Sequence, residues 1–221
     1  MNKTKSMDAK SLVLLALLAA VAYVVMAIGR IPVVLFLSYD PKDAIIAISG
    51  FMFGPLPALL ITVVVALIEM VTVSSTGVIG LIMNVLSTAA FVCPAVLLYQ
   101  KKKTIRSAVV GLIIGVVTMV AVMLLWNWLI TPLYMDASRE QIAAMLLPTF
   151  LPFNALKGGL NMALTLLLYK PLVTILRRTG MLPASTSPNT TQKKSRVGVF
   201  LFALALLATG IVVLLVYNGV L

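Results

Sequence analysis

The stretch that decides the fold class is residues 11–29, SLVLLALLAAVAYVVMAIG, which contain no charged side chain. A helix of about 20 mostly apolar residues is long enough to cross the hydrocarbon core of a bilayer. Lys3, Lys5 and Lys10 precede the run, as basic residues do in a secretory signal peptide. However, the run is longer than the apolar part of such a signal, and its small residues are not gathered at one cleavage position. We therefore interpret residues 12–29 as a transmembrane helix.

The whole chain has the composition of a membrane protein. Of its 221 residues, 62% are hydrophobic and 10% are charged, and the mean hydropathy is +1.13. Soluble domains contain about 45–50% apolar and about 25% charged residues, so a soluble globular domain and a disordered chain are both excluded. We expect an all-α integral membrane protein. Further apolar segments predict helices at residues 42–53, 56–73, 78–99, 107–130, 149–176 and 197–217.

The basic residues gather on one side of these segments. Of the 17 lysines and arginines, three lie near the N-terminus, four between residues 101 and 106, and six between residues 170 and 196. Four of the six acidic residues fall in the opposite connections: Asp40, Asp43, Asp136 and Glu140. Because cytoplasmic loops are enriched in lysine and arginine, we expect a cytoplasmic N-terminus and six crossings up to about residue 176. The net charge of +11 then reflects topology and indicates no nucleic-acid partner.

Three parts follow from this pattern. Residues 1–178 are expected to form a six-helix membrane domain. Residues 179–196 are rich in Pro, Ser and Thr and end in basic residues, which is typical of a flexible cytoplasmic linker. Residues 197–221 contain a further transmembrane helix, which would place the C-terminus outside the cell.

The second apolar segment is irregular. Residues 42–53 make about 18 Å of helix, which is too short to cross a hydrocarbon core about 30 Å thick. The segment ends at Gly54-Pro55-Leu56-Pro57, which predicts a turn. It is preceded by an apolar loop, Ile31–Asp40, which we expect to cover a binding site. The alternative is a re-entrant or interfacial segment that binds no ligand.

Polar residues follow one face of the sixth predicted helix. Asn154, Lys157, Gly158 and Asn161 lie at positions i, i+3, i+4 and i+7. A lysine near the centre of a membrane helix costs about 2.5–3.5 kcal/mol on insertion scales, so it is expected to face a cavity or a partner. The alternative is a lysine that extends to the outer interface, with asparagines that bond between helices.

Two further groups of residues are candidates for ligand contact. Gly80 and Asn84 lie near one face of the fourth helix, where small residues permit close helix packing or the close approach of a flat ligand. Asn127 lies between two tryptophans of an expected outer aromatic belt and points away from them.

Ala16 and Ala20 form a small-xxx-small pair, which fits either internal packing or a partner helix.

Several classes of chemistry lack their residues. The chain contains no histidine, one cysteine (Cys93) and no GxxxxGK[ST] phosphate loop. We therefore expect no disulfide, no metal site, no catalytic site and no ATP hydrolysis by this chain.

Taken together, five stretches resemble the riboflavin-specific substrate-binding (S) component of bacterial energy-coupling-factor transporters. They occur in order and cover about residues 10–176. The stretches are LSYDPKD at 37–43, GFMFGP at 50–55, STGVIG at 75–80 with Asn84, NWLITPLY at 127–134, and LPFNALK at 151–157 with Asn161.

This resemblance implies a six-helix bundle in the bacterial cell membrane that binds riboflavin on its outer side under the loop between helices 1 and 2. It implies docking through Ala16 and Ala20 on a transmembrane coupling subunit, two cytosolic ATPase subunits, and no cofactor besides the transported riboflavin. The seventh helix departs from the family pattern. The binding residues implied are Asn127, Asn154 and Lys157 for the polar edges of the ligand, Asp43 for ribityl hydroxyls, Gly80 and Asn84 beside the ligand, and Phe36 with Leu35, Phe153 and Ile31 for burial of the ring.

Two other hypotheses remain at this point. A stand-alone secondary carrier of a small neutral solute would need acids inside the membrane for ion coupling, and the sequence places only Glu69 there. Glu69 could pair with Lys157 or Arg30, or reach the interface. A scaffold protein would use the polar residues only for contacts between helices, and the five ordered stretches argue against it.

Overall fold

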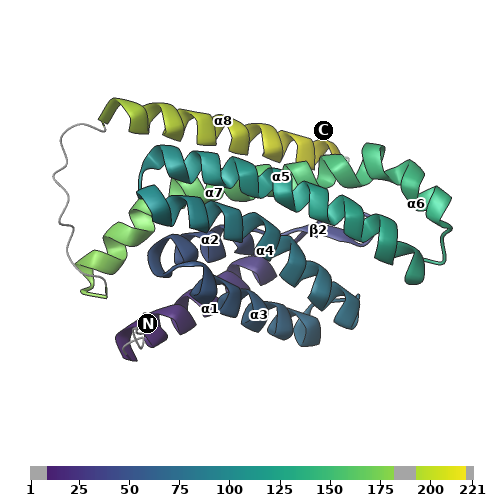
Figure 1. The fold of residues 1–221 in the computed structure, drawn as a ribbon, viewed down its shortest axis with the longest axis horizontal. Coiled ribbons are helices and arrows are strands. Elements are labelled where there is room, and N and C mark those ends of the chain that lie inside the picture. The colour runs from purple at the N-terminus through teal and green to yellow at the C-terminus, as the bar shows by residue number, and fades with distance from the viewer. Residues whose placement is uncertain (1–8, 182–192, 218–221) are drawn as a thin grey trace.

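The computed structural model describes residues 9–181 and 193–217, which form a bundle of helices around a short β-hairpin (Figure 1). In chain order the elements are α1 (Ala9–Gly29), β1 (Ile31–Val34), β2 (Leu37–Tyr39), α2 (Lys42–Phe53), α3 (Pro55–Thr72), α4 (Gly77–Lys102), α5 (Ile105–Ile130), a 3-10 turn (Thr131–Leu133), α6 (Arg139–Met145), a π-helical segment (Leu146–Phe150), α7 (Leu151–Arg178) and α8 (Lys193–Tyr217). The prediction of an all-α membrane protein is confirmed.

Six helical segments of the described chain are long and apolar enough to cross a membrane. They are Ala9–Gly29, Pro55–Thr72, Gly77–Lys102, Ile105–Leu133, Arg139–Arg178 and Val197–Val216. Helix α2 is not among them because it has only 12 residues. Ten of these are buried, so α2 lies within the bundle and not against lipid. It ends at Gly54, where φ is +100°, a conformation that glycine adopts readily.

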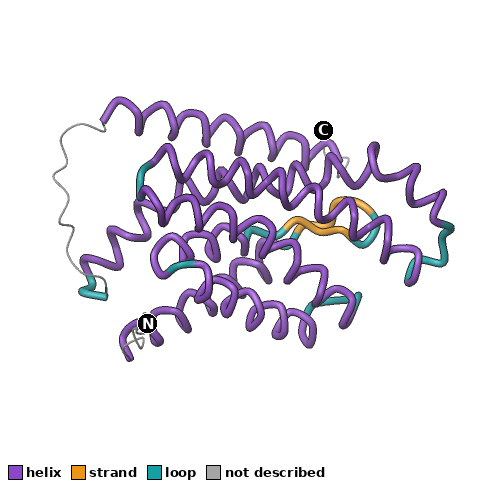
Figure 2. The backbone as a smooth tube through the Cα atoms, in the orientation of Figure 1, coloured by secondary structure: helices purple, strands orange, loops and turns teal. Residues whose placement is uncertain are grey.

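The segment expected to be an apolar loop is instead an antiparallel hairpin. Ile31 pairs with Tyr39, Pro32 with Ser38, and Val34 with Leu37. Figure 2 shows the two strands running from the start of α2 toward α6, so the hairpin extends the path of the short helix. Paired strands satisfy many of their own backbone groups, and at membrane depth such backbone is tolerated where it is buried in protein or lines a cavity.

Helices α4 and α5 approach each other closely at two glycines. A Cβ atom on Gly111 would lie 2.8 Å from the Ala95 carbonyl oxygen, and one on Gly115 would collide with the backbone of Phe91. The connection after α5, which the sequence left without structure, contains α6. This helix begins with a capping box in which Ser138 and Gln141 each bond the other's backbone N–H.

The predicted seventh helix is present as α8, and it packs on α7 and on the hairpin. Gly210 lies against Leu160 of α7, where a Cβ atom would collide with the leucine side chain. Leu214 packs in a cluster with Tyr39 and Leu160. Figure 1 shows α8 on the opposite side of the bundle from α1. Most of the predicted linker, residues 182–192, lies outside the described residues.

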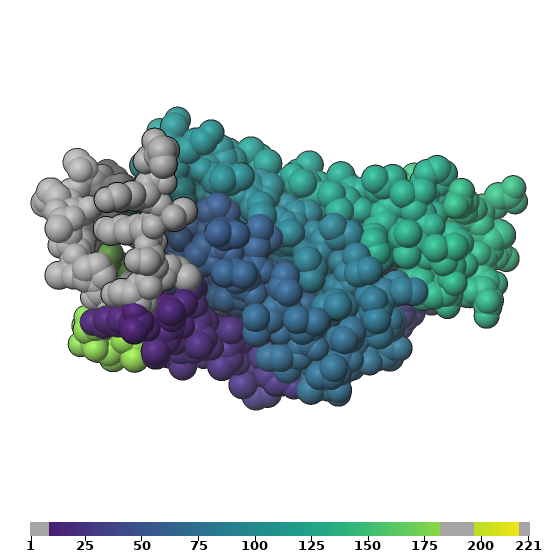
Figure 3. Space-filling model, turned by 60° about the horizontal axis from the view of Figure 1, so that its bottom comes forward, coloured from purple at the N-terminus to yellow at the C-terminus, as the bar shows by residue number. Residues whose placement is uncertain are grey.

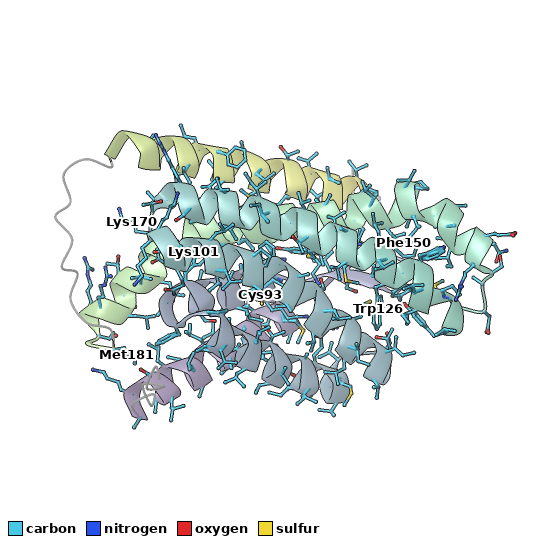
Figure 4. The ribbon with its side chains drawn as sticks, in the orientation of Figure 1. Cys93, Lys101, Trp126, Phe150, Lys170 and Met181 are labelled. Carbon is cyan, nitrogen blue, oxygen red and sulfur yellow. The ribbon has the colours of Figure 1, made fainter. Side chains whose placement is uncertain are left out.

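The two ends of the bundle differ in charge. Lys101 and Lys170 lie near one end, and Phe150 lies toward the other (Figure 4). The exposed basic residues Lys102, Lys103 and Arg106 surround the α4–α5 turn at the first end. The predicted clustering of positive charge at one end is therefore visible in the fold.

Candidate functional site

A narrow cavity lies among the hairpin, α3, α4, α5 and α7. Its volume is about 30 Å³, so the inner cavity is nearly closed in this structure. Hydroxyl, amide and charged groups line it together with apolar side chains. The lining residues are Arg30, Phe36, Leu37, Ser38, Asp40, Glu69, Ser74, Thr76, Met83, Asn84, Ser87, Met123, Phe153, Asn154 and Lys157. This mixture suits a flat ligand with polar edges.

A wider cleft adjoins this cavity and shares Phe36 and Thr76 with it. Its volume is about 490 Å³, and Leu35, Ser75, Ile79, Tyr134 and Met135 complete its lining. The ring of Phe36 meets that of Tyr134 edge to face with centroids 5.3 Å apart. The turn of the hairpin thus contacts the connection between α5 and α6, and together they form one wall of the entrance.

Charged side chains form a buried chain of ion pairs beside the cavity. Arg30 donates to Glu69 over 3.1 Å, and the second oxygen of Glu69 accepts from Lys42 over 2.8 Å. Lys42 also reaches Oδ2 of Asp40 at 3.3 Å, and Lys157 donates to that same oxygen over 3.1 Å. The side chain of Arg30 is 23% exposed, whereas Lys42 is 2% and Asp40 is 4% exposed.

The chain of charges ends on α2 and α4. Nζ of Lys157 lies 4.0 Å from Oδ2 of Asp43, whose Oδ1 accepts a 2.6 Å hydrogen bond from Thr88. The ion-pair system contains three cations, Arg30, Lys42 and Lys157, and three anions, Asp40, Asp43 and Glu69. Its formal charge is therefore balanced, so a neutral ligand would not disturb it.

Asn161 connects the beginning of α2 to α7. Its Oδ1 accepts from the backbone N–H of Ala44, and its Nδ2 donates to the carbonyl of Asp40, each over 3.1 Å. The first N–H groups of a helix lack partners within the helix. A side chain of α7 thus satisfies one of these groups of α2 and fixes the backbone of Asp40 next to Lys157.

The Asp40 carboxyl lies in the short connection between β2 and α2. Burial raises its pKa, but the positive charges of Lys157 and Lys42 outweigh burial and hold the pKa below the usual value of an aspartic acid. Asp40 is therefore ionised at neutral pH, and an ionised carboxylate can only accept hydrogen bonds.

Four of the seven residues predicted to contact the ligand line the cavity: Phe36, Asn84, Asn154 and Lys157. Asn154 donates from Nδ2 to the carbonyl of Phe150 over 2.7 Å. Phe153, predicted to help bury the ring, also lines the cavity, and Leu35 lines the outer cleft, but Ile31 lines neither.

The other three predicted residues lie outside the lining. Asp43 is fully buried behind Lys157. Gly80 lies against the side chain of Thr76, which itself faces the cavity. Asn127 is fully buried and uses its amide locally, because it donates to the Met123 carbonyl over 2.6 Å and accepts from Thr131 over 2.9 Å.

Sequence reasoning missed Asp40 and Lys42 as buried charges and left Glu69 as the only acid inside the membrane. The structure buries Asp40 and Asp43 as well. Of the pairings considered for Glu69, the one with Arg30 is present, and Lys42 takes the place of Lys157. The signal available was the run DPKD at 40–43, three charges at the start of a short apolar helix.

Ala16 and Ala20 both lie on the exposed face of α1. The neighbouring residues Leu14, Leu15 and Leu18 point inward and are buried in the main core. Internal packing, which the sequence left open as the reason for this small-residue pair, is therefore provided by the leucines instead.

Comparison with known proteins identifies the architecture. Residues 10–169 match the family described as "ECF transporter, substrate-specific component". A solved structure, described as "Structure and mechanism of the S component of a bacterial ECF transporter", superposes with a TM-score of 0.65 at 26% sequence identity. The match covers 76% of the present chain and 98% of the chain in the solved structure.

Two curated relatives cover most of the chain. One is "Riboflavin transporter RibU" of Staphylococcus aureus (strain TCH60), 26% identical over 186 residues, which are 80% of this chain and 97% of the relative. The other is "Riboflavin transporter FmnP" of Bacillus subtilis (strain 168), 27% identical over 165 residues, which are 69% of this chain and 86% of the relative. Helix α8 begins after the last residue of the family match.

Proposed function

The chain belongs to the substrate-specific components of energy-coupling-factor (ECF) transporters, and from this premise we propose that it captures riboflavin for import. The family is one of transport components and not of enzymes. The observation that carries the proposal is the cavity in which Lys157, Asn154 and Asn84 face apolar walls that include Phe36 and Phe153. The two relatives described as riboflavin transporters support the same ligand.

The chemistry of riboflavin fits this lining. The molecule is neutral, has a flat ring system with carbonyl and N–H groups on one edge, and carries a chain of hydroxyls. Asparagine amides both donate and accept hydrogen bonds, whereas a lysine ammonium only donates. The balanced ion pairs leave no net charge to be compensated by the ligand.

The first test is an absorbance spectrum of the detergent-purified protein, followed by titration of ligand-free protein with riboflavin. We expect a co-purifying flavin band and quenching of flavin fluorescence that saturates. A set of other water-soluble vitamins serves as the control. Folded protein that shows neither band nor quenching, or that binds another vitamin in preference, would refute riboflavin as the ligand.

We also propose an orientation in the bacterial cell membrane. The cavity faces outward and the N-terminus is cytoplasmic, because most of the exposed basic residues, Lys101 and Lys170 among them, lie at the opposite end of the bundle (Figure 4). Helix α8 would then return the chain to the outer side. This orientation lets the cavity load from outside the cell.

A docking face for the transmembrane coupling subunit is proposed on α1. Ala16 and Ala20 lie exposed there, and Figure 3 shows α1 and α3 side by side on a face that carries no part of α8. Small residues let a partner helix approach closely. Two cytosolic ATPase subunits would energise the complex from the basic end.

Replacing Ala16 and Ala20 together by tryptophan is expected to abolish co-purification with the coupling subunit while riboflavin binding is retained. The reason is steric, because two large side chains would hold the partner helix away from α1. Val212→Trp on α8 is the matched control, since Val212 is exposed on the opposite side of the bundle. A complex that survives the double substitution would place the docking face elsewhere.

A further inference from the structure

One oxygen of a cavity-lining carboxylate has no partner. Oδ2 of Asp40 accepts from both Lys157 and Lys42, but Oδ1 is buried without a hydrogen bond among the described residues. An unpaired, buried acceptor of an ionised group is costly, and native proteins rarely leave one unless a ligand or a water satisfies it. Asp40 lines the cavity, so a bound ligand would lie next to this carboxylate.

Asp43 presents a similar oxygen but in a different place. Its Oδ2 also lacks a hydrogen bond, yet Asp43 does not line the cavity and lies behind Lys157 at 4.0 Å. Its other oxygen is taken by Thr88. Asp43 therefore balances the charge of Lys157, and Asp40 is the carboxylate placed for ligand contact.

We propose that Asp40 reads the imide edge of the flavin by accepting a hydrogen bond from the ring N3–H, while Lys157 donates to the adjoining ring carbonyl. This inference rests on the proposed function and names the part of the ligand that the site selects. A lysine has three N–H donors, and Lys157 uses one of them on Asp40. The pair therefore offers a donor and an acceptor side by side, which matches the neighbouring carbonyl and N–H of an imide.

This pairing sets the orientation of the ligand in the site. The imide edge would enter first, toward the buried ion pairs. The rings would then lie among Phe36, Phe153 and Met123, and the ribityl chain would extend toward the hydroxyl groups of Ser75 and Tyr134 in the outer cleft. A ribityl hydroxyl can also donate to a carboxylate, so the test must separate the two donors.

The experiment measures the dissociation constants of riboflavin and N3-methylriboflavin for the wild-type protein, Asp40→Asn, Asp40→Ala and Asp43→Asn. We expect the wild type to bind the N3-methyl compound at least about tenfold more weakly, because methylation removes the donor and leaves Oδ1 unpaired. Asp40→Ala removes both the acceptor and the atoms that a methyl group would meet, so the preference for riboflavin should vanish. Asp40→Asn retains the size of the side chain and should weaken riboflavin binding.

The matched control is Asp43→Asn, which should keep the preference for riboflavin over its N3-methyl analogue. Equal binding of the two flavins by the wild type would overturn the inference while leaving riboflavin as the ligand. A preference that persists unchanged in Asp40→Ala would likewise assign the N3–H to another residue.

Lumiflavin, which lacks the ribityl chain, tests whether a ribityl hydroxyl is the donor instead. If Asp40→Asn weakens the binding of riboflavin but not that of lumiflavin, Asp40 contacts the ribityl hydroxyls and the inference is wrong. Failure of the wild type to bind any of these flavins would instead refute the proposed function itself.

Discussion

Lys157→Met is expected to weaken riboflavin binding by about 10- to 150-fold. Hydrogen bonds to charged groups contribute about 1.5–3 kcal/mol, and about 1.4 kcal/mol corresponds to a factor of ten in affinity. Lys157 is 6% exposed, lines the cavity and also holds Asp40, so its loss removes a donor to the ligand and disturbs the neighbouring carboxylate. Fluorescence titration with riboflavin measures the effect.

The matched control for this substitution is Lys170→Met on the same helix. Lys170 is exposed near the basic end of α7, away from the cavity, and should leave riboflavin affinity unchanged. A thermal unfolding curve for each variant separates a lost contact from a lost fold. Unaltered affinity in folded Lys157→Met protein would show that the polar face of α7 serves only helix packing.

Lys42→Met should produce the largest loss of stability. Lys42 is 2% exposed and bonds both Asp40 and Glu69, so removing its charge leaves the buried cluster with one excess anion. Breaking a buried ion pair by removing one partner typically costs about 3–5 kcal/mol. For a chain of this length that corresponds to a fall of about 6–20 °C in the unfolding midpoint. Thermal unfolding in detergent, without ligand, measures it.

A second substitution tests the physical reason. In Lys42→Met/Glu69→Gln the two lost charges have opposite sign, so the buried cluster is again balanced and part of the stability should return. Lys101→Met is the control, because this lysine is exposed at the end of α4. If Lys42→Met unfolds at the wild-type temperature, or if the double variant is less stable by the sum of the two single losses, charge balance is not what Lys42 provides.

The buried ion pairs join the parts of the molecule that form the binding site. Lys42 of α2, Glu69 of α3 and Lys157 of α7 are all connected through Asp40 or directly to one another. Arg30, between α1 and the hairpin, is joined to the same set through Glu69. A ligand that contacts Asp40 would therefore act on the junction of four elements at once.

The sequence by itself determined the fold class, the number of long helices and the asymmetry of charge. These properties depend on local quantities, namely the length and hydropathy of each run and the counts of lysine and arginine between the runs. It also placed Asn154 and Lys157 on one helix face, because residues three positions apart lie on the same face of a helix. The extra helix at 197–217 was predicted for the same reason and is present as α8.

Only the tertiary structure decided which charges meet. Asp40 and Lys157 are 117 residues apart in the chain, and Lys42 and Glu69 are 27 apart. No local pattern fixes such pairs, because they depend on the relative rotation of helices and on how far the short α2 and the hairpin extend into the bundle. The burial of Asp40 also depends on tertiary contacts. Hydropathy assigned Asp40 to an outer connection, but the fold encloses it. Its ion pairs with Lys42 and Lys157 compensate the cost of removing a carboxylate from water.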